Sequence, residues 1–201
     1  MQNMTTDFSS IVEEMRIHGM PAPYSKQNIT VSIPGAHEIL KNAFDYFLTF
    51  QNTSTTWKKE YDEVADWLTN NEGRGLFLWG DCGLGKSLLG RYIIPAILLK
   101  YCRKVVSVYN VGEMNGKINE ILTRNLISID DIGTEEIVNV YGNKRLAFAE
   151  IMDSVEKNGK LIIISTNLDK EALIEKYGFR VFDRIISTTK RVKFEGESLR
   201  R

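Results

Sequence analysis

A stretch near the middle of the chain combines glycines, a lysine and a serine at a spacing that suits phosphate chemistry. It reads Gly80-Asp81-Cys82-Gly83-Leu84-Gly85-Lys86-Ser87 and matches the pattern G-x-x-x-x-G-K-[ST]. Glycine lets the backbone turn tightly, so that N–H groups converge on phosphate oxygens at a helix N-terminus. Lys86 would then reach the β- and γ-phosphates, and the Ser87 hydroxyl would bind Mg²⁺. The pattern predicts a nucleotide-binding loop.

The segments on either side of this loop agree with that interpretation. Residues 75–79 form an apolar run that predicts a buried strand, and residues 86–100 predict a helix. Pro95 should kink that helix near Arg91, because proline clashes with the carbonyl four residues earlier. A chance glycine-rich turn would require neither neighbour. The residues expected to contact ATP are Gly80, Asp81, Cys82, Gly83, Leu84, Gly85, Lys86, Ser87 and Leu88.

Polar side chains end two later apolar runs. Residues 126–129 lead into Asp130 and Asp131, and residues 161–165 lead to Asn167. We expect Asp130, with Ser87, to hold Mg²⁺ and Asp131 to polarise the attacking water. Asn167 can orient that water, since ligands bind at the carboxyl ends of parallel strands. The alternatives are two ordinary acids at a strand end and an Asx turn that opens the next helix.

Two arginines lie four residues apart in a predicted helix over residues 179–186. Arg180 and Arg184 therefore share one helix face. As surface charges, either could pair with Asp183 or Glu175. As a functional group, an arginine here could reach the γ-phosphate of a neighbouring subunit.

Apolar strands that alternate with helices predict a three-layer α/β domain with a parallel sheet covered on both faces. The expected strands are 75–79, 104–111, 126–129 and 161–165, and the expected helices are 37–50, 57–68 with Thr56 as N-cap, 112–124, 143–157 and 170–176. We divide the chain into an N-terminal extension, residues 1–55, with a short helical arm near residues 11–17, and an ATPase domain, residues 56–201.

Composition restricts the class of protein. The chain has 201 residues, 43% of them apolar and 26% charged, with a formal net charge of zero. These values fit a globular protein and exclude a strongly basic nucleic-acid binder. The two cysteines and the lack of a His or Cys cluster indicate a reduced, cytoplasmic protein without a zinc site. The apolar runs are too short to cross a membrane, and the N-terminus shows no signal-peptide pattern.

Three stretches together resemble the DnaC/IstB-like AAA+ ATPases, the family of replicative helicase loaders and of transposition helper ATPases. They are residues 126–135 (LISIDDIGTE), 163–168 (IISTNL) and 179–184 (FRVFDR). The resemblance implies an AAA+ type of P-loop fold with little or no C-terminal lid. It also implies an ATP-hydrolysing homo-oligomer that acts with a replicative helicase or a transposase. It places Asn167 at the sensor-1 position, Arg184 at the arginine finger, and Arg200, in a closing G-x-S-x-R stretch, at a second sensor.

Other functions remain compatible with the sequence. A P-loop small-molecule kinase would need an acceptor pocket, and a nucleotide-switched scaffold would bind ATP with little turnover. Any contact between this protein and single-stranded DNA should be weak. The basic patches of the chain that could bind it are short: Arg103-Lys104 and Lys190-Arg191-Lys193. The stretch between the second strand and residue 126 is also shorter than is usual in the resembling family.

Overall fold

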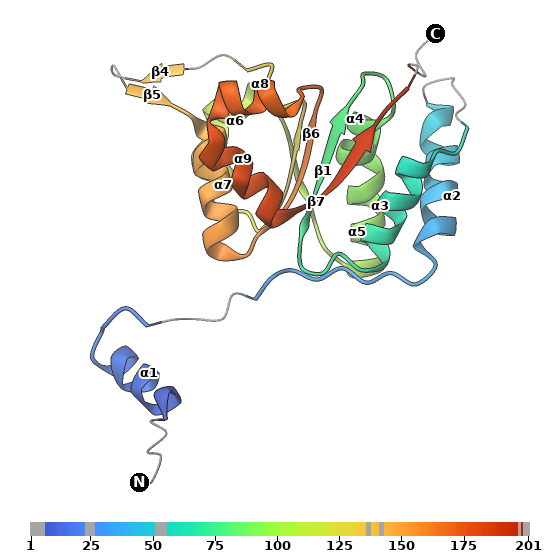
Figure 1. The fold of residues 1–201 in the computed structure, drawn as a ribbon. Coiled ribbons are helices and arrows are strands. Elements are labelled where there is room, and N and C mark those ends of the chain that lie inside the picture. The colour runs from blue at the N-terminus through green and yellow to red at the C-terminus, as the bar shows by residue number, and fades with distance from the viewer. Residues whose placement is uncertain are drawn as a thin grey trace, which may run out of the picture.

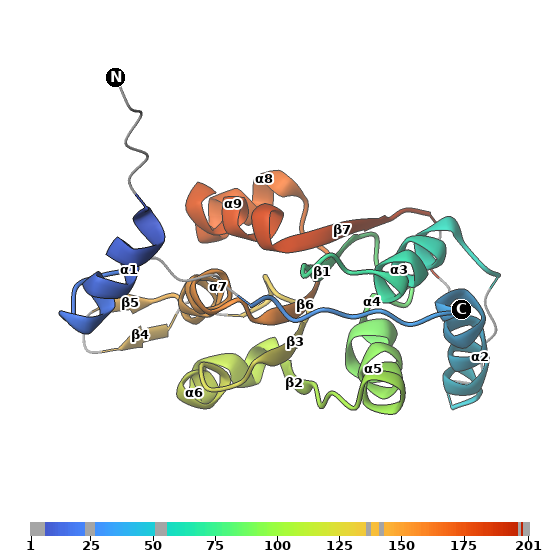
Figure 2. The same cartoon turned by 90° about the horizontal axis from the view of Figure 1, so that it is seen from below.

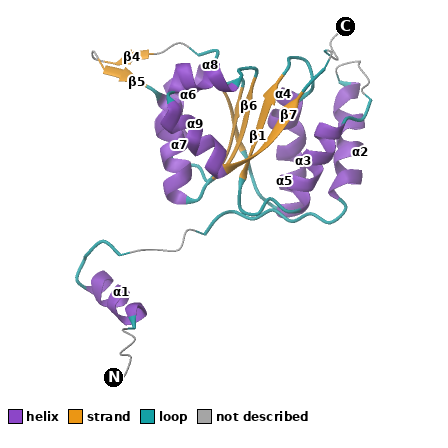
Figure 3. Cartoon of the chain, viewed as in Figure 1, coloured by secondary structure: helices purple, strands orange, loops and turns teal. Residues whose placement is uncertain are grey.

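The computed structural model describes residues 7–22, 27–50, 56–135, 138–140, 143–196 and 198. Its centre is a sheet of five parallel strands in the order β2-β3-β6-β1-β7 (Figures 1 and 3). Their bounds are β1 Gly75–Gly80, β2 Ser107–Asn110, β3 Leu126–Asp130, β6 Leu161–Thr166 and β7 Thr189–Phe194. The first strand of the sheet along the chain thus lies between the last two.

Helices cover both faces of this sheet (Figure 2). One face carries α2 (Ala36–Thr49), α3 (Lys59–Thr69) and the helical run after the loop, which consists of α4 (Lys86–Leu88), η1 (Leu89–Ile93) and α5 (Ile94–Cys102). The other face carries α6 (Val111–Ile121), α7 (Ala147–Asn158), α8 (Lys170–Tyr177) and α9 (Phe179–Thr188). The three-layer α/β prediction is confirmed.

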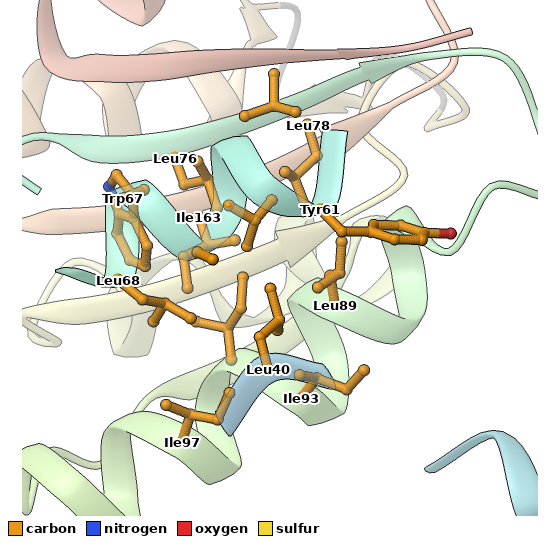
Figure 4. Close-up of a cluster of buried hydrophobic side chains, with 14 of the residues drawn as sticks. Leu40, Tyr61, Trp67, Leu68, Leu76, Leu78, Leu89, Ile93, Ile97 and Ile163 are labelled. Carbon is orange, nitrogen blue, oxygen red and sulfur yellow. The ribbon is translucent and has the colours of Figure 1, made fainter. Parts of the chain in front are cut away.

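Two apolar cores separate these layers. β6 contributes alternate side chains to each core, as expected for a central strand buried on both faces. Figure 4 shows the first core, in which leucines and isoleucines of β1, β6 and η1 meet Tyr61, Trp67 and Leu68 of α3. Phe44 and Tyr61 pack with their ring centroids 4.4 Å apart. This packing fixes β1, and therefore the loop that follows it.

Part of the N-terminal extension is built into the same core. Val31 and Ile33 are buried there, as is one face of α2. The fully buried Asn71 holds the extended segment: its Oδ1 accepts the Val31 N–H at 2.8 Å, and its Nδ2 donates to the Ile29 carbonyl at 3.0 Å. By contrast, α1 (Phe8–Ile17) has no buried residue. The division at residue 55 stays a prediction.

Several predicted boundaries need correction. The N-cap of α3 is Lys58, not Thr56. The second strand covers only 107–110, because Asn110 already caps α6 by accepting the Glu113 N–H. Residues 143–145 are not helical, because their backbone pairs antiparallel with residues 138–140 to form a hairpin of β4 (Val138–Val140) and β5 (Asn143–Arg145).

The sequence predicted a kink near Arg91, and the structure has a π-helical turn at this place. η1 spans residues 89–93, and Pro95 occupies the first turn of α5, where its missing N–H is tolerated. A wider turn of this kind is common at functional sites. Within the described residues, no helix has the length and apolar character needed to span a bilayer.

Candidate functional site

The glycine-rich loop joins β1 to α4 and requires glycine at two places that contact the C-terminal segment. Gly80 has φ +112°, and a Cβ there would lie 2.2 Å from the Phe194 carbonyl oxygen. Gly83 has φ +76°, and a Cβ there would lie 2.0 Å from Ser198 Oγ. Only glycine fits positions that combine positive φ with such close neighbours. The loop is therefore enclosed on one side by the chain that follows β7.

That C-terminal segment also bonds directly to the loop. The Asp81 N–H donates to the Phe194 carbonyl at 2.8 Å, and the Asp81 carboxylate accepts the Gly196 N–H at 3.0 Å. Arg200, the predicted second sensor, lies outside the described residues.

Lys86 is the buried cation of the loop. Its Nζ donates to the carbonyl oxygens of Gly80, at 2.9 Å, and Asp81, at 2.5 Å. Burial lowers the pKa of Lys86, while nearby Cys82, Asp131, Asp81 and Asp130 act in the opposite direction. The hydrogen-bond partners of this ammonium are carbonyls of its own loop, which leave its charge available to a phosphate.

The other predicted loop residues differ in their exposure to solvent. Leu84 and Leu88 are buried, Gly85 has a left-handed φ of +86° as the N-cap of α4, and Ser87 is half-buried in the first turn. Asp81 and Cys82 are exposed. The backbone N–H groups at the start of α4 thus face the same end of the sheet as the acids of β3.

Asp130 ends β3 and is only 5% exposed. The parallel register of β3 with β6 brings it beside Ser165, whose hydroxyl donates a short hydrogen bond to Asp130 Oδ1. The other carboxylate oxygen lies 3.6 Å from Nη1 of Arg91, which projects from the π-helical turn. Asp130 is therefore held by one hydroxyl and one guanidinium.

Asp131 occupies a left-handed backbone conformation with φ +62°. For residues other than glycine this conformation costs about 1–2 kcal/mol, and Asp and Asn are among those that adopt it most readily. Two hydrogen bonds support this conformation. The Asp131 N–H donates to Ser165 Oγ at 2.9 Å, and the Asp131 carboxylate accepts a hydrogen bond from Asn167 Nδ2 at 3.0 Å. Strain of this kind persists where surrounding contacts hold it, and it is frequent at active sites. The structure thus brings Asp131 and Asn167 into direct contact, and the Asp131 carboxylate is near enough to Lys86 to act on its pKa.

Arg184 lies elsewhere. It projects from α9 onto α7, where Nη1 pairs with Asp153 and Nε donates to Glu156 at 2.8 Å. Its partners are therefore neither Asp183 nor Glu175, the two acids that sequence spacing suggested. The side chain is 12% exposed. Its role as a finger for a neighbouring subunit stays a prediction. Arg180, one turn earlier, is exposed.

Three features of the site were not predicted. Ser165 bridges both aspartates, and its signal was a small hydroxyl at the end of an apolar strand. Arg91 was expected only as the place of a kink, yet it pairs with Asp130. Glu135, which follows the two aspartates, bonds to Tyr177 of α8. No sequence pattern indicated that contact, because it depends on where α8 docks.

The residues present suit a nucleotide with a divalent cation. A buried ammonium within a loop at a helix N-terminus fits phosphate, and hydroxyl and carboxylate oxygens are the ligands that Mg²⁺ prefers. Among the described residues, no group of three or more His, Cys, Asp or Glu is arranged to hold a metal by protein ligands alone.

Together, the strand order, the loop after β1 and the paired acids after β3 define a three-layer P-loop fold of the AAA+ type. The chain is similar in structure to the DnaC helicase loader, with a TM-score of 0.57 and 16% identity over 77% of this chain and 99% of that one. It is also similar to DnaI, with a TM-score of 0.53 and 18% identity over 82% and 96%.

A third similar structure is AMPPCP-bound DnaA from Aquifex aeolicus, with a TM-score of 0.52 and 18% identity over 71% of this chain and 49% of that one. Neither protein-family models nor curated protein sequences give a match to this chain. The likeness to helicase loaders that the motifs suggested is therefore confirmed at the level of the fold.

Proposed function

We propose that this protein binds and hydrolyses MgATP. One observation supports the proposal above all others. Lys86, a buried lysine in a glycine-rich loop, lies near enough to Asp130 and Asp131, at the end of β3, for their charges to act on its pKa. In this proposal the backbone of residues 80–88 and the Lys86 ammonium bind the phosphates. Ser87 and Asp130 hold Mg²⁺, which neutralises phosphate charge.

Asp131 would act as the general base. Its carboxylate accepts the proton of a water positioned against the γ-phosphate, and Asn167 Nδ2 holds it in orientation. Both side chains lie at the carboxyl end of the sheet, where the loop N–H groups also converge. The reaction needs no acceptor other than water, which separates this proposal from a small-molecule kinase.

The process in which ATP is used is a further part of the proposal. We place it in DNA replication, as a helicase loader, because DnaC and DnaI are similar over nearly their whole length. The partner would be a replicative helicase, and a transposase is the alternative that the sequence resemblance adds. A homo-oligomer with Arg184 supplied in trans, weak contact with single-stranded DNA and a cytoplasmic location belong to the same proposal.

Calorimetry and phosphate release test the biochemical core of this proposal. Wild-type protein should bind MgATP and release phosphate, whereas Lys86→Ala should lose affinity because the ammonium no longer neutralises phosphate charge. Lys100→Ala, which removes an exposed lysine from α5, is the matched control. Equal ATP affinity in Lys86→Ala and in the control would contradict the site.

The Arg91–Asp130 pair favours a second candidate function. The Arg91 guanidinium lies 3.6 Å from Asp130, the proposed metal ligand, and competes with Mg²⁺ for its carboxylate. With this competition the protein would bind ATP but hydrolyse it slowly. The protein would then be a nucleotide-switched scaffold. Tight ATP binding without phosphate release, even with DNA and a helicase added, would decide for this candidate over the ATPase.

A further inference from the structure

The backbone strain at Asp131 needs a source of support beyond β6. Asp131 N–H and Ile132 N–H both bond to Ser165, which fixes the start of the loop. Gly133 then presses against Leu168, since a Cβ at Gly133 would lie 2.3 Å from Leu168 Cδ1. These contacts come from β6 and from the segment that directly follows it. A second element contacts the same loop.

α8 supplies that second element. Lys176 Nζ donates to the carbonyl oxygens of Gly133 and Glu135, at 2.6 Å each. The Glu135 carboxylate accepts the Gly133 N–H at 2.8 Å and the hydroxyl of Tyr177. Two adjacent residues of one helix therefore bond to both the backbone and the carboxylate of the loop. We call Glu135, Lys176 and Tyr177 the α8 clamp.

The α8 clamp is mostly removed from water. The side chain of Glu135 is 8% exposed and that of Lys176 is 21% exposed, while Tyr177 is 5% exposed. Burial and the bond to Glu135 both raise the pKa of Tyr177, so its hydroxyl stays a donor. Buried polar groups with satisfied hydrogen bonds define a single geometry better than they add stability. This makes the clamp suited to positioning.

We infer that the α8 clamp is a positioning device for Asp131: it fixes the loop of residues 131–135 against β6 and so aims the Asp131 carboxylate at the water. This inference deepens the proposed hydrolysis and rests on it for its catalytic meaning. In this inference the three residues act through their bonds to the loop. The clamp also anchors the chain just before the β4–β5 hairpin, which projects away from the domain (Figure 1).

Kinetics give the first test. Tyr177→Phe and Glu135→Leu should each lower kcat about 10-fold or more with little change in ATP affinity, because misplacing a reacting group by about 1 Å can cost ~10²-fold. Leucine has no acceptor oxygen, so either change removes the hydrogen bond between Tyr177 and Glu135. The double variant should therefore lose no more than the worse single variant. Glu175→Gln, an exposed neighbour on α8, is the control and should match wild type.

Melting temperatures show whether each variant is folded. Unchanged kcat in both folded single variants, or a loss of ATP affinity parallel to the loss of kcat, would overturn the inference. So would additive losses in the double variant. If the wild-type protein itself does not hydrolyse ATP, the proposed function fails. The second test, which needs no hydrolysis, then decides whether the clamp positions Asp131.

The second test needs no activity. Asp131→Gly removes the strain at φ +62°, since glycine adopts positive φ freely. If the clamp enforces that conformation, Asp131→Gly should raise the melting temperature more in the wild-type background than in Tyr177→Phe, where the loop can already relax. Equal changes in the two backgrounds would show that residue 131 is independent of the clamp and would overturn the inference.

Discussion

The guanidinium of Arg91 lies 3.6 Å from the carboxylate of Asp130, the acid proposed as a magnesium ligand. Arg91 therefore competes with a cation for the same oxygen. We expect Arg91→Met to lower the Mg²⁺ concentration that half-saturates ATP binding by about 2- to 5-fold, because a partly exposed ion pair contributes up to about 1 kcal/mol. Arg103→Met removes an exposed arginine at the end of α5 and should leave the Mg²⁺ dependence unchanged. A higher Mg²⁺ requirement in Arg91→Met would contradict competition.

Asp131→Asn should bind ATP normally and hydrolyse it at least about 10²-fold more slowly, since a positioned base contributes ~10²–10⁴ in rate. Asparagine tolerates the left-handed conformation of residue 131, so the backbone should be preserved. Phosphate release under single-turnover conditions measures the effect. Asp45→Asn, an exposed change on α2, is the control. Turnover that survives in Asp131→Asn would exclude this carboxylate as the base.

Arg184→Ala tests the finger supplied in trans. If Arg184 reaches a neighbour's γ-phosphate, the variant should bind ATP and hydrolyse it poorly, because a finger acts on the transition state. Mixing it with Lys86→Ala should restore part of the activity, since the Lys86→Ala subunit still offers its Arg184 to an intact site. A finger supplied in trans acts only between assembled subunits, so activity per subunit should rise with protein concentration. In the assembly Arg184 must leave Asp153 and Glu156. Arg180→Ala, on the same helix, is the comparison. If co-assembled mixtures stay inactive, Arg184 has only the structural role seen here.

Asn71→Ala should lower the free energy of unfolding by about 3 kcal/mol. The change leaves the Val31 N–H and the Ile29 carbonyl without their side-chain partner in a buried place, and each unsatisfied group costs about 1–3 kcal/mol. Urea unfolding measures the loss. Asn70→Ala removes an exposed side chain that accepts one bond, from Glu72, and should cost much less. Similar losses in both variants would argue against the proposed importance of the Asn71 contacts.

Stability should depend on pH through Lys160. Burial lowers the pKa of Lys160 from its ordinary 10.5, and Nζ donates to the Leu122 carbonyl at 2.5 Å. Between the lowered and the ordinary pKa the unfolded chain binds more protons, so the free energy of unfolding rises with pH. The stability of wild type relative to Lys160→Met should therefore increase as the pH is raised from about 7 to about 10. Lys170→Met, exposed on α8, should show no such trend. A constant difference would refute the burial effect.

Much of the fold could be predicted because apolar runs and glycine-rich turns are local signals. The strand before the loop, the strand that ends in Asp130 and the strand before Asn167 lie where the sequence placed them. The shared sheet edge follows from parallel topology, and so does the contact between Asp131 and Asn167. The sequence did not indicate how β3 and β6 align, and that register brings Ser165 between the two aspartates.

Other features depend on tertiary contacts that no local pattern encodes. Residues 143–145 lie close to a strong helical pattern, yet pairing with residues 138–140 makes them a strand. Asn71 lies just after a predicted helix over residues 57–68, but its full burial comes from the segment around Val31 that bonds to it. Arg184 looked solvated because its acidic partners lie on another helix. Side chains that bridge distant elements are thus where prediction from the sequence ends.

The central place of β1 between β6 and β7 has a consequence for the order of folding. The strand that carries the phosphate loop pairs with Ile163 and Thr189, which lie far along the chain. Because contacts of such sequence separation form late, β1 gains its neighbours only after nearly the whole chain has left the ribosome. Until then both edges of β1 lack their partner strands, and a nascent chain that stops before β7 is open to aggregation. Nucleotide added during refolding should therefore act only at the last step, when β7 closes against the loop.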